Sequence, residues 1–179
     1  SESMTEQTQT ERRRIEFFFD RDCPEANPEK MPLEGIDDDI QAGMALIAEA
    51  EMPYSAGSTL REIFSEPGEN GMSLYHAWFR SGYVLPFHSH NVDCLYYVLA
   101  GELRMGARVL RKGDGFFVPK DMGYGYEVGP EGLEILEFRN ATDFNLTFAK
   151  NPMERWAKIV STYNERGAIW EEEVPPSAR

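Results

Sequence analysis

Two histidines separated by one residue, His88 and His90, are the side chains of this sequence best suited to chemistry by type and spacing. Strand side chains alternate between the two faces of a sheet, so these imidazoles would point to the same side. Neutral imidazole is a common ligand of zinc, iron and copper. The pair therefore predicts half of a metal site, with two buried histidines hydrogen-bonded to their neighbours as the alternative.

Two glycines and a cysteine extend this pair into a longer pattern. Five residues separate Gly82 from His88, three separate His90 from Cys94, and six separate Cys94 from Gly101. The spacing resembles the first signature motif of the cupin superfamily, in which the position of Cys94 is a metal-binding glutamate. The resemblance implies a small double-sheeted β-barrel in which His88 and His90 bind a metal ion.

A second segment is similar to the second cupin motif. Gly113 and Pro119 stand at the glycine and proline positions of that motif. Asp121, Tyr124 and Val128 stand where the family has glycine, histidine and asparagine. The resemblance therefore implies the fold here, but it puts Tyr124 at the position of the fourth usual metal ligand.

Cys94 has three possible roles. As a thiolate it would be a third ligand for iron or zinc, or a catalytic redox group, and as a neutral thiol it would be a small packing residue. A cysteine at this motif position also resembles the thiol dioxygenases, iron cupins in some of which it is cross-linked to a tyrosine. Those enzymes hold iron with three histidines, and the second motif of this chain supplies none.

Tyr124 and His76 are further candidates. Tyr124 would bind a metal as a phenolate, or act on substrate as an acid, base or hydrogen-bond donor; a pocket-lining ring is the alternative. His76 shares one face of a predicted strand with Leu74, Trp78 and Arg80, so the direction of its side chain is open. It is a candidate third metal ligand, with a hydrogen-bonded histidine of the barrel wall as the alternative.

Aromatic residues predict a pocket for a small organic molecule, because ligand pockets combine apolar walls with a few polar groups. The candidate lining residues are Trp78, Phe87, Tyr96, Phe117, Tyr124, Tyr126 and Phe138. Arg80, Glu137 and Arg139 are candidates to position a carboxylate or hydroxyl group of the substrate. A barrel that fills its interior with such rings is the alternative.

Composition excludes some classes of partner. The chain has 179 residues, 41% of them hydrophobic, and a net charge of −13, so it lacks the clustered cations that nucleic acids and acidic membranes attract. No apolar run approaches the roughly 20 residues of a membrane-spanning helix. Cys23 and Cys94 make no disulfide framework, which favours a reduced, cytoplasmic setting.

Patterning divides the chain into four parts: a disordered tail (1–14), an N-terminal extension (15–71), a cupin barrel (72–150) and a C-terminal helix with a tail (151–179). The extension is expected to hold a strand at Ile15–Phe19, where the chain would dimerise, followed by a loop and a helix. The barrel is expected to consist of short strands joined by turns, including a hairpin turn at Gly129–Gly132. The predicted class is all-β, a cupin-like double-stranded β-helix (jelly-roll barrel) with N- and C-terminal helices.

Local signals also predict the helix ends. The acidic run Asp37–Asp39 suits the start of the first helix, and Pro53 is expected to close it. The second helix is expected to have Asn151 as its N-cap and to end at Gly167.

The first functional hypothesis is a metal-dependent enzyme acting on a small organic substrate, aromatic molecules included, with oxygenase chemistry favoured. His88 and His90 would bind iron or zinc, Cys94 or His76 would complete the ligand set, and Tyr124 would contact substrate. A metal-dependent lyase or isomerase and a metal-free, non-catalytic binding protein are the alternatives. A homodimer is expected in each case.

Overall fold

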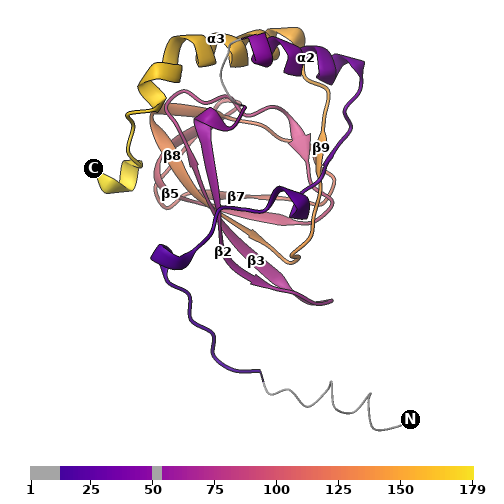
Figure 1. Cartoon of the computed structure of the whole chain (residues 1–179), viewed down its shortest axis with the longest axis vertical. Coiled ribbons are helices and arrows are strands. Elements are labelled where there is room, and N and C mark those ends of the chain that lie inside the picture. Colours follow the sequence, from indigo (N-terminus) through magenta and orange to yellow (C-terminus); the bar gives the residue numbers. More distant parts are fainter. Residues whose placement is uncertain (1–12, 50–53) are drawn as a thin grey trace.

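A computed structural model describes residues 13–49 and 54–179 and shows two β-sheets that form a barrel, with two α-helices at one end (Figure 1). The strands are β1 (Leu33–Glu34), β2 (Ser58–Glu66), β3 (Met72–Phe79), β4 (His88–Ser89), β5 (Cys94–Met105), β6 (Arg108–Arg111), β7 (Gly115–Val118), β8 (Glu127–Arg139) and β9 (Leu146–Phe148). The helices are α2 (Asp38–Glu49) and α3 (Met153–Trp170), with 3-10 turns at Asp20–Asp22, Pro28–Lys30, Tyr54–Gly57 and Pro176–Ala178. This confirms the predicted mainly β architecture with two helices.

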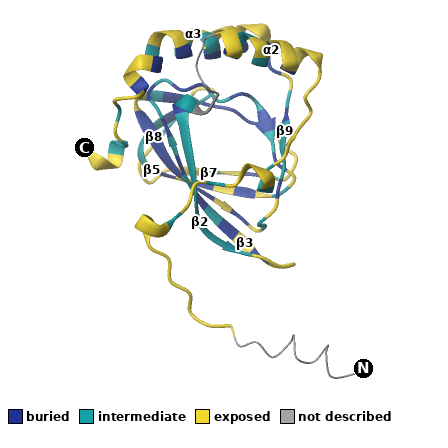
Figure 2. Ribbon diagram, viewed as in Figure 1, coloured by how far each residue is buried: buried dark blue, intermediate teal, exposed yellow. Residues whose placement is uncertain are grey.

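The larger sheet has the order β2-β3-β8-β5-β6, with β7 also paired to β5, and the smaller has the order β1-β9-β4. Both β1 and β2 come from the predicted N-terminal extension, so that part of the chain contributes to both sheets. Alternate residues of β3 are buried, as expected for a strand with one face in a core. Figure 2 shows buried and half-buried residues along the barrel strands, and exposed ones along the N-terminal segment and much of the two helices.

The two helices pack on each other over one end of the barrel. Helix α3 buries Trp156, Ile159 and Tyr163 on one face. Gly43 of α2 lies against Trp156, where a Cβ atom would be only 2.2 Å from the indole ring. Only glycine therefore lets α2 approach α3 this closely. No helix in the described ranges is both long and apolar enough to span a membrane.

The predicted strand at Ile15–Phe19 is wrong. These residues are exposed and have no strand partner in the described part of the chain. Backbone hydrogen bonds to the edge of β2 begin only afterwards, where Glu62 N–H donates to Pro24 O (3.0 Å) and Ala26 N–H to Leu60 O (2.8 Å). The residues that precede Pro24 therefore have a strand-like sequence but no neighbouring strand.

The predicted hairpin turn at Gly129–Gly132 is also wrong, because β8 runs straight through it. Gly132 has a positive φ of 86°. A Cβ atom on Gly101 would be only 2.0 Å from the carbonyl oxygen of Gly132, so Gly101 has no room for a side chain. The register of β5 against β8 shifts beside Gly101. These glycines therefore mark irregularities in two long paired strands.

The predicted helix ends need correction too. Helix α3 starts at Met153 with Pro152 as its N-cap, and it continues through Gly167 to Trp170. The Asn151 side chain instead accepts from Phe87 N–H (2.7 Å) and donates to Phe87 O (3.0 Å). Helix α2 starts in the predicted acidic run, but Pro53 and most of the predicted tail lie outside the described residues.

Candidate functional site

His88 and His90 lie side by side in the barrel interior, as their spacing predicted. His88 belongs to β4, and its backbone exchanges hydrogen bonds of 3.0 and 2.9 Å with that of Tyr124. Both histidines are 4% exposed, and their ring centroids are 5.0 Å apart. The first motif and the Tyr124 segment therefore meet inside the barrel.

Hydrogen bonds to the backbone fix the tautomer of each imidazole. Nδ1 of His88 lies 2.8 Å from Pro86 O, and Nδ1 of His90 lies 2.6 Å from Asn145 O. A carbonyl oxygen only accepts, so each Nδ1 carries the proton and each Nε2 presents a lone pair. These lone pairs are the ones that would bind a metal.

Both imidazoles are neutral at pH 7. Burial, with a smaller effect of the Arg139 charge, lowers the pKa of His88 to about 4. Burial and Arg139 lower the pKa of His90 to about 3. The backbone acceptors oppose these shifts, but they do not cancel them.

The guanidinium of Arg139 lies at the centre of the site. It donates from Nε to Cys94 Sγ (3.1 Å), and its terminal nitrogens donate to Glu137 (3.3 Å), to Tyr96 OH (3.3 Å) and to His90 Nε2 (3.4 Å). Arg139 is 2% exposed. Burial alone would lower the pKa of this group, but the surrounding Tyr96 and Glu137 raise it, so the guanidinium stays charged.

Cys94 faces inward and is 1% exposed. Burial raises the pKa of its thiol despite the nearby Arg139, so the thiol is protonated at pH 7. Its sulfur accepts from Arg139 and donates to Val92 O (3.5 Å). This environment is typical of a packing thiol rather than of a metal-bound thiolate.

Tyr124 and Tyr96 link the arginine to the first histidine. Their hydroxyl groups are 2.5 Å apart, and Tyr124 OH lies 3.2 Å from His88 Nε2. Since Arg139 donates to Tyr96, the chain of donors runs from Arg139 through the two tyrosines to His88. Burial raises the pKa of both phenols, so both are neutral.

These residues do not fit a resident divalent metal. Both Nε2 atoms already accept, from Tyr124 and from Arg139, and the buried guanidinium would repel a second cation at this position. Within residues 13–49 and 54–179, no three His, Cys, Asp or Glu side chains come together as a metal site. Arg139 and the tyrosines provide the contacts that a metal ion would otherwise make.

His76 lies apart from this cluster, on the outer face of the larger sheet. Its Nε2 is 2.8 Å from Glu134 Oε2, and its neighbours on β3, Tyr75 and Ala77, are the residues that point inward. The structure therefore does not bring His76 together with His88 and His90.

The predicted lining residues divide between the inside and the outside of the barrel. Tyr96, Tyr124 and Tyr126 are buried inside, whereas Phe117 and Phe138 are 58% and 38% exposed on the outer face. For these two the expectation was wrong, because strand alternation turns Phe116 inward instead, where it stacks on Tyr96 with ring centroids 4.6 Å apart.

Trp78 and Arg80 form a stacked pair, with the guanidinium carbon of Arg80 3.3 Å from the ring centroid of Trp78. Arg80 also donates to Thr59 Oγ1 (2.9 Å). Phe87, the remaining predicted ring, lies under Arg155 at 3.9 Å. None of these three residues contacts the imidazole pair in the described structure.

A cavity of about 610 Å³ lies between residues 25–33 and the start of β2. Its lining includes apolar, aromatic and charged groups, namely Pro28, Lys30, Leu60, Tyr75, Arg80 and Phe144. Phe144 also stacks edge-on against His90 (5.7 Å) and lies 4.2 Å from the guanidinium of Arg139. The cavity is therefore separated from the buried cluster by an aromatic wall.

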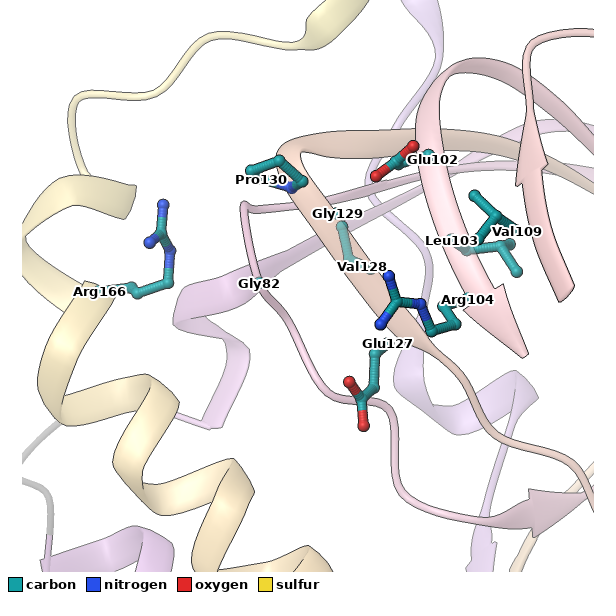
Figure 3. A pocket seen from close by; sticks show the side chains of 10 residues that line it. All are labelled: Gly82, Glu102, Leu103, Arg104, Val109, Glu127, Val128, Gly129, Pro130 and Arg166. Atoms are coloured by element: carbon teal, nitrogen blue, oxygen red, sulfur yellow. The ribbon is translucent and has the colours of Figure 1, made fainter. Parts of the chain in front are cut away.

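A smaller cleft of about 280 Å³ lies between β5, β8 and α3 (Figure 3). Three of its four charged side chains already have partners: Glu127 binds Lys158, Glu102 binds Arg111, and Arg166 donates to Ser81. This cleft therefore offers less to a ligand than the cavity beside Phe144.

The signal for Arg139 in the sequence was weak. It is one of several charged residues in predicted strands, and such residues usually face solvent. Only the register that places Arg139 opposite Cys94 shows that its side chain enters the barrel.

No protein-family model matches the sequence, and no curated protein matches it. Among solved structures, an RmlC-like cupin protein from Ralstonia eutropha JMP134 is 15% identical and superposes with a TM-score of 0.52, over 90% of this chain and 92% of its own. KdgF from a Halomonas species is 19% identical with a TM-score of 0.45, over 71% and 94%. The polyketide cyclase RemF from Streptomyces resistomycificus is 17% identical with a TM-score of 0.48, over 59% and 83%.

At these identities, the likeness concerns the fold. The first of the three covers nearly the whole of both chains. The chain has the cupin fold.

Proposed function

We propose that this cupin-fold protein binds a small organic acid without a resident metal ion. The observation that carries the proposal is the Arg139 guanidinium, which donates to His90 Nε2 and Cys94 Sγ, two atoms that a metal would need. Around the Arg139 guanidinium, the thiol of Cys94 and the phenols of Tyr96 and Tyr124 are neutral and hydrogen-bonded, and this arrangement suits binding better than redox chemistry.

The cavity of about 610 Å³ is the proposed ligand site. Its volume falls within the range of roughly 300–1,000 Å³ that is usual for small-molecule sites. Leu60, Tyr75 and Phe144 would pack against the aliphatic or aromatic part of the ligand. Because Phe144 also contacts His90 and Arg139, a movement of its ring on ligand binding would reach both residues.

Arg80 is the proposed recognition group for a carboxylate. Burial lowers its pKa, so the charged form gains from an anionic partner. Its guanidinium donates to Thr59 and to Trp78 O, while the buried Nε has no partner in the described residues. Lys30, the other cation of the lining, is already paired with Glu62 at 3.0 Å.

Calorimetry with a panel of aromatic and aliphatic carboxylic acids and their amides tests the proposal. We expect acids to bind better than the matching amides, and Arg80→Gln to weaken binding about tenfold or more. Arg61→Gln is the matched control, because Arg61 pairs with Asp20 and does not line the cavity. Equal binding of acids and amides would contradict the role of Arg80.

A metal-dependent oxygenase is the second candidate function, favoured by the paired inward lone pairs of His88 and His90. Elemental analysis of the protein without a histidine tag, before and after iron or zinc loading, separates the two. Our proposal expects metal far below one ion per chain, and a gain of zinc binding in Arg139→Met. A full equivalent of iron that is lost in His88→Ala, with oxygen uptake on thiols, diketones or phenols, would support the oxygenase instead.

A further inference from the structure

Tyr75 is the one fully buried polar side chain among the described residues that line the cavity of about 610 Å³. It is 2% exposed, and its hydroxyl group has no hydrogen-bond partner in the described part of the chain. Buried hydroxyl groups usually have a partner, because leaving one unpaired costs free energy. The Tyr75 hydroxyl is therefore a free polar group that a ligand of this cavity can satisfy.

The hydroxyl group lies on the cavity side of the Tyr75 ring. Strand register places Tyr75 opposite Glu62, and after burial the charge of Glu62 is the next largest cause that raises the pKa of the phenol. Glu62 in turn pairs with Lys30, which lines the cavity. Since the raised pKa keeps the phenol protonated at pH 7, its hydroxyl both donates and accepts hydrogen bonds.

Arg80 provides a second polar position in the same cavity, at some distance from the first. Its guanidinium folds back over the Trp78 ring and donates to Thr59 Oγ1, and Thr59 lies opposite Trp78 in the pairing of β2 with β3. The guanidinium therefore lies at the level of Trp78, three residues along β3 from Tyr75. At roughly 3.3 Å per residue, the two polar groups are about 10 Å apart along the strand.

The lining between these two levels is apolar. Leu60 lies opposite Ala77, and Phe144 packs edge-on against the Tyr75 ring with centroids 5.8 Å apart. Such a site suits a molecule with an apolar middle and an oxygen atom at each end. A 2-hydroxy acid carries its oxygens on neighbouring carbons, so it is too short to reach both polar groups.

Charge fixes the orientation of such a molecule. Asp143, like Glu62, raises the pKa of the Tyr75 phenol, so two carboxylates lie near this end of the cavity. Arg139 acts in the opposite direction, but it belongs to the buried cluster behind the aromatic wall. A ligand carboxylate is therefore better placed at Arg80, which leaves a neutral polar group for Tyr75.

We propose that the ligand is an elongated acid with a hydroxyl or carbonyl group at the end remote from its carboxylate, and that Tyr75 hydrogen-bonds to this group. A 4-hydroxyaryl acid is a simple member of this class. The inference rests on the proposed binding of acids at Arg80, and it adds the residue that recognises the other end of the ligand. Tyr75 is then a specificity-determining residue of the site.

Calorimetry on the full chain with three related acids tests the proposal: 4-hydroxyphenylpropanoate, phenylpropanoate, and phenyllactate, whose hydroxyl group is next to the carboxylate. We expect wild type to bind the first about three- to tenfold more tightly than the second, which is the effect of one hydrogen bond. Phenyllactate should bind no more tightly than phenylpropanoate. Tyr75→Phe should remove the preference for the 4-hydroxyl group, whereas Tyr97→Phe, on the exposed outer face, should keep it.

Thermal unfolding separates a lost ligand contact from a loss of folding. Because the Tyr75 hydroxyl has no partner in the residues described, Tyr75→Phe should unfold at the temperature of wild type. If wild type binds phenylpropanoate but gains nothing from the 4-hydroxyl group, or if Tyr75→Phe keeps the preference, this proposal is overturned and the acid site at Arg80 stands. If none of the three acids binds, the proposed function fails, and the role of Tyr75 fails with it.

Discussion

The two faces of β8 carry two polar clusters that are built from similar residues and held in different ways. Glu137 and Arg139 point into the barrel, where they join His90, whereas Glu134 points outward to His76. The inner cluster is enclosed by strands whose hydrogen-bonded pairing fixes their positions. The outer cluster is covered by the 3-10 turn near the C-terminus, where Ser177 N–H donates to Glu134 Oε1 at 2.8 Å.

The difference between the clusters shows in the ionisation of their members. Inside, burial and the Arg139 charge force the imidazole of His90 to be neutral. Outside, burial would raise the pKa of Glu134, but hydrogen bonds from Ser177 and His76 outweigh it and lower that pKa. The inner cluster therefore depends on a single buried cation, and the outer cluster on several hydrogen bonds.

The largest expected effect comes from removing that cation. Arg139→Met should cost about 3–5 kcal/mol of unfolding free energy, because it leaves Glu137 buried without its ion pair. Urea unfolding measures this cost. Adding Glu137→Gln to Arg139→Met should recover part of the loss; if the double variant is no more stable than the single one, the pair is not the cause.

Acid should destabilise the protein through the two inner histidines. Their folded pKa values of about 4 and 3 lie below the unfolded value of about 6.5. Below pH 6.5 the unfolded state therefore binds more protons, and stability is lost as the pH falls toward 4 and 3, by up to about 2.7 kcal/mol per pH unit for both groups.

Urea midpoints between pH 7 and 4.5 measure this slope. His90→Gln should remove about half of the histidine contribution, and the double variant with His88→Gln should remove all of it. An unchanged slope in the double variant would mean that other groups control the acid sensitivity.

A smaller effect is expected from the tyrosine chain. Tyr124→Phe deletes the hydroxyl that contacts both Tyr96 and His88, and it should cost about 1–2 kcal/mol. Thermal unfolding measures the loss, with Tyr97→Phe on the exposed outer face as the control. Equal effects of the two changes would contradict a structural role for the chain of hydroxyl groups.

The smallest effect is expected on the outer face. Glu134→Gln keeps most of the hydrogen-bonding geometry and should cost less than about 1 kcal/mol. A loss as large as that of Arg139→Met in the same urea experiment would remove the contrast between the two clusters.

Much of the fold could be predicted from the sequence, because the decisive signals are local. Alternation placed His88 and His90 on one side, and the motif spacing indicated the barrel. The error at Gly129–Gly132 arose because glycines that permit a positive φ serve equally in turns and in irregular strands. The strand prediction at Ile15–Phe19 was wrong because a strand needs a neighbouring strand to pair with, and the local sequence does not show whether one is present.

The content of the site was harder to predict. Local sequence gives the face of a strand residue but not which long side chain reaches across the barrel, so the central place of Arg139 depended on the register of β8 against β5. His76 has the right chemistry for a ligand, but it lies on the other face of its strand. Motif positions therefore predicted four of the central residues, His88, His90, Cys94 and Tyr124, and tertiary pairing decided the rest.

The Asn151 side chain gives the barrel a mechanical linkage. It holds both backbone polar groups of Phe87, the residue before His88, and it lies two residues before the start of α3. A tilt or shift of that helix would therefore pull directly on the strand that carries His88. A partner that binds at the helical end of the molecule would therefore shift the His88 imidazole through Asn151 and Phe87, without changing the larger sheet.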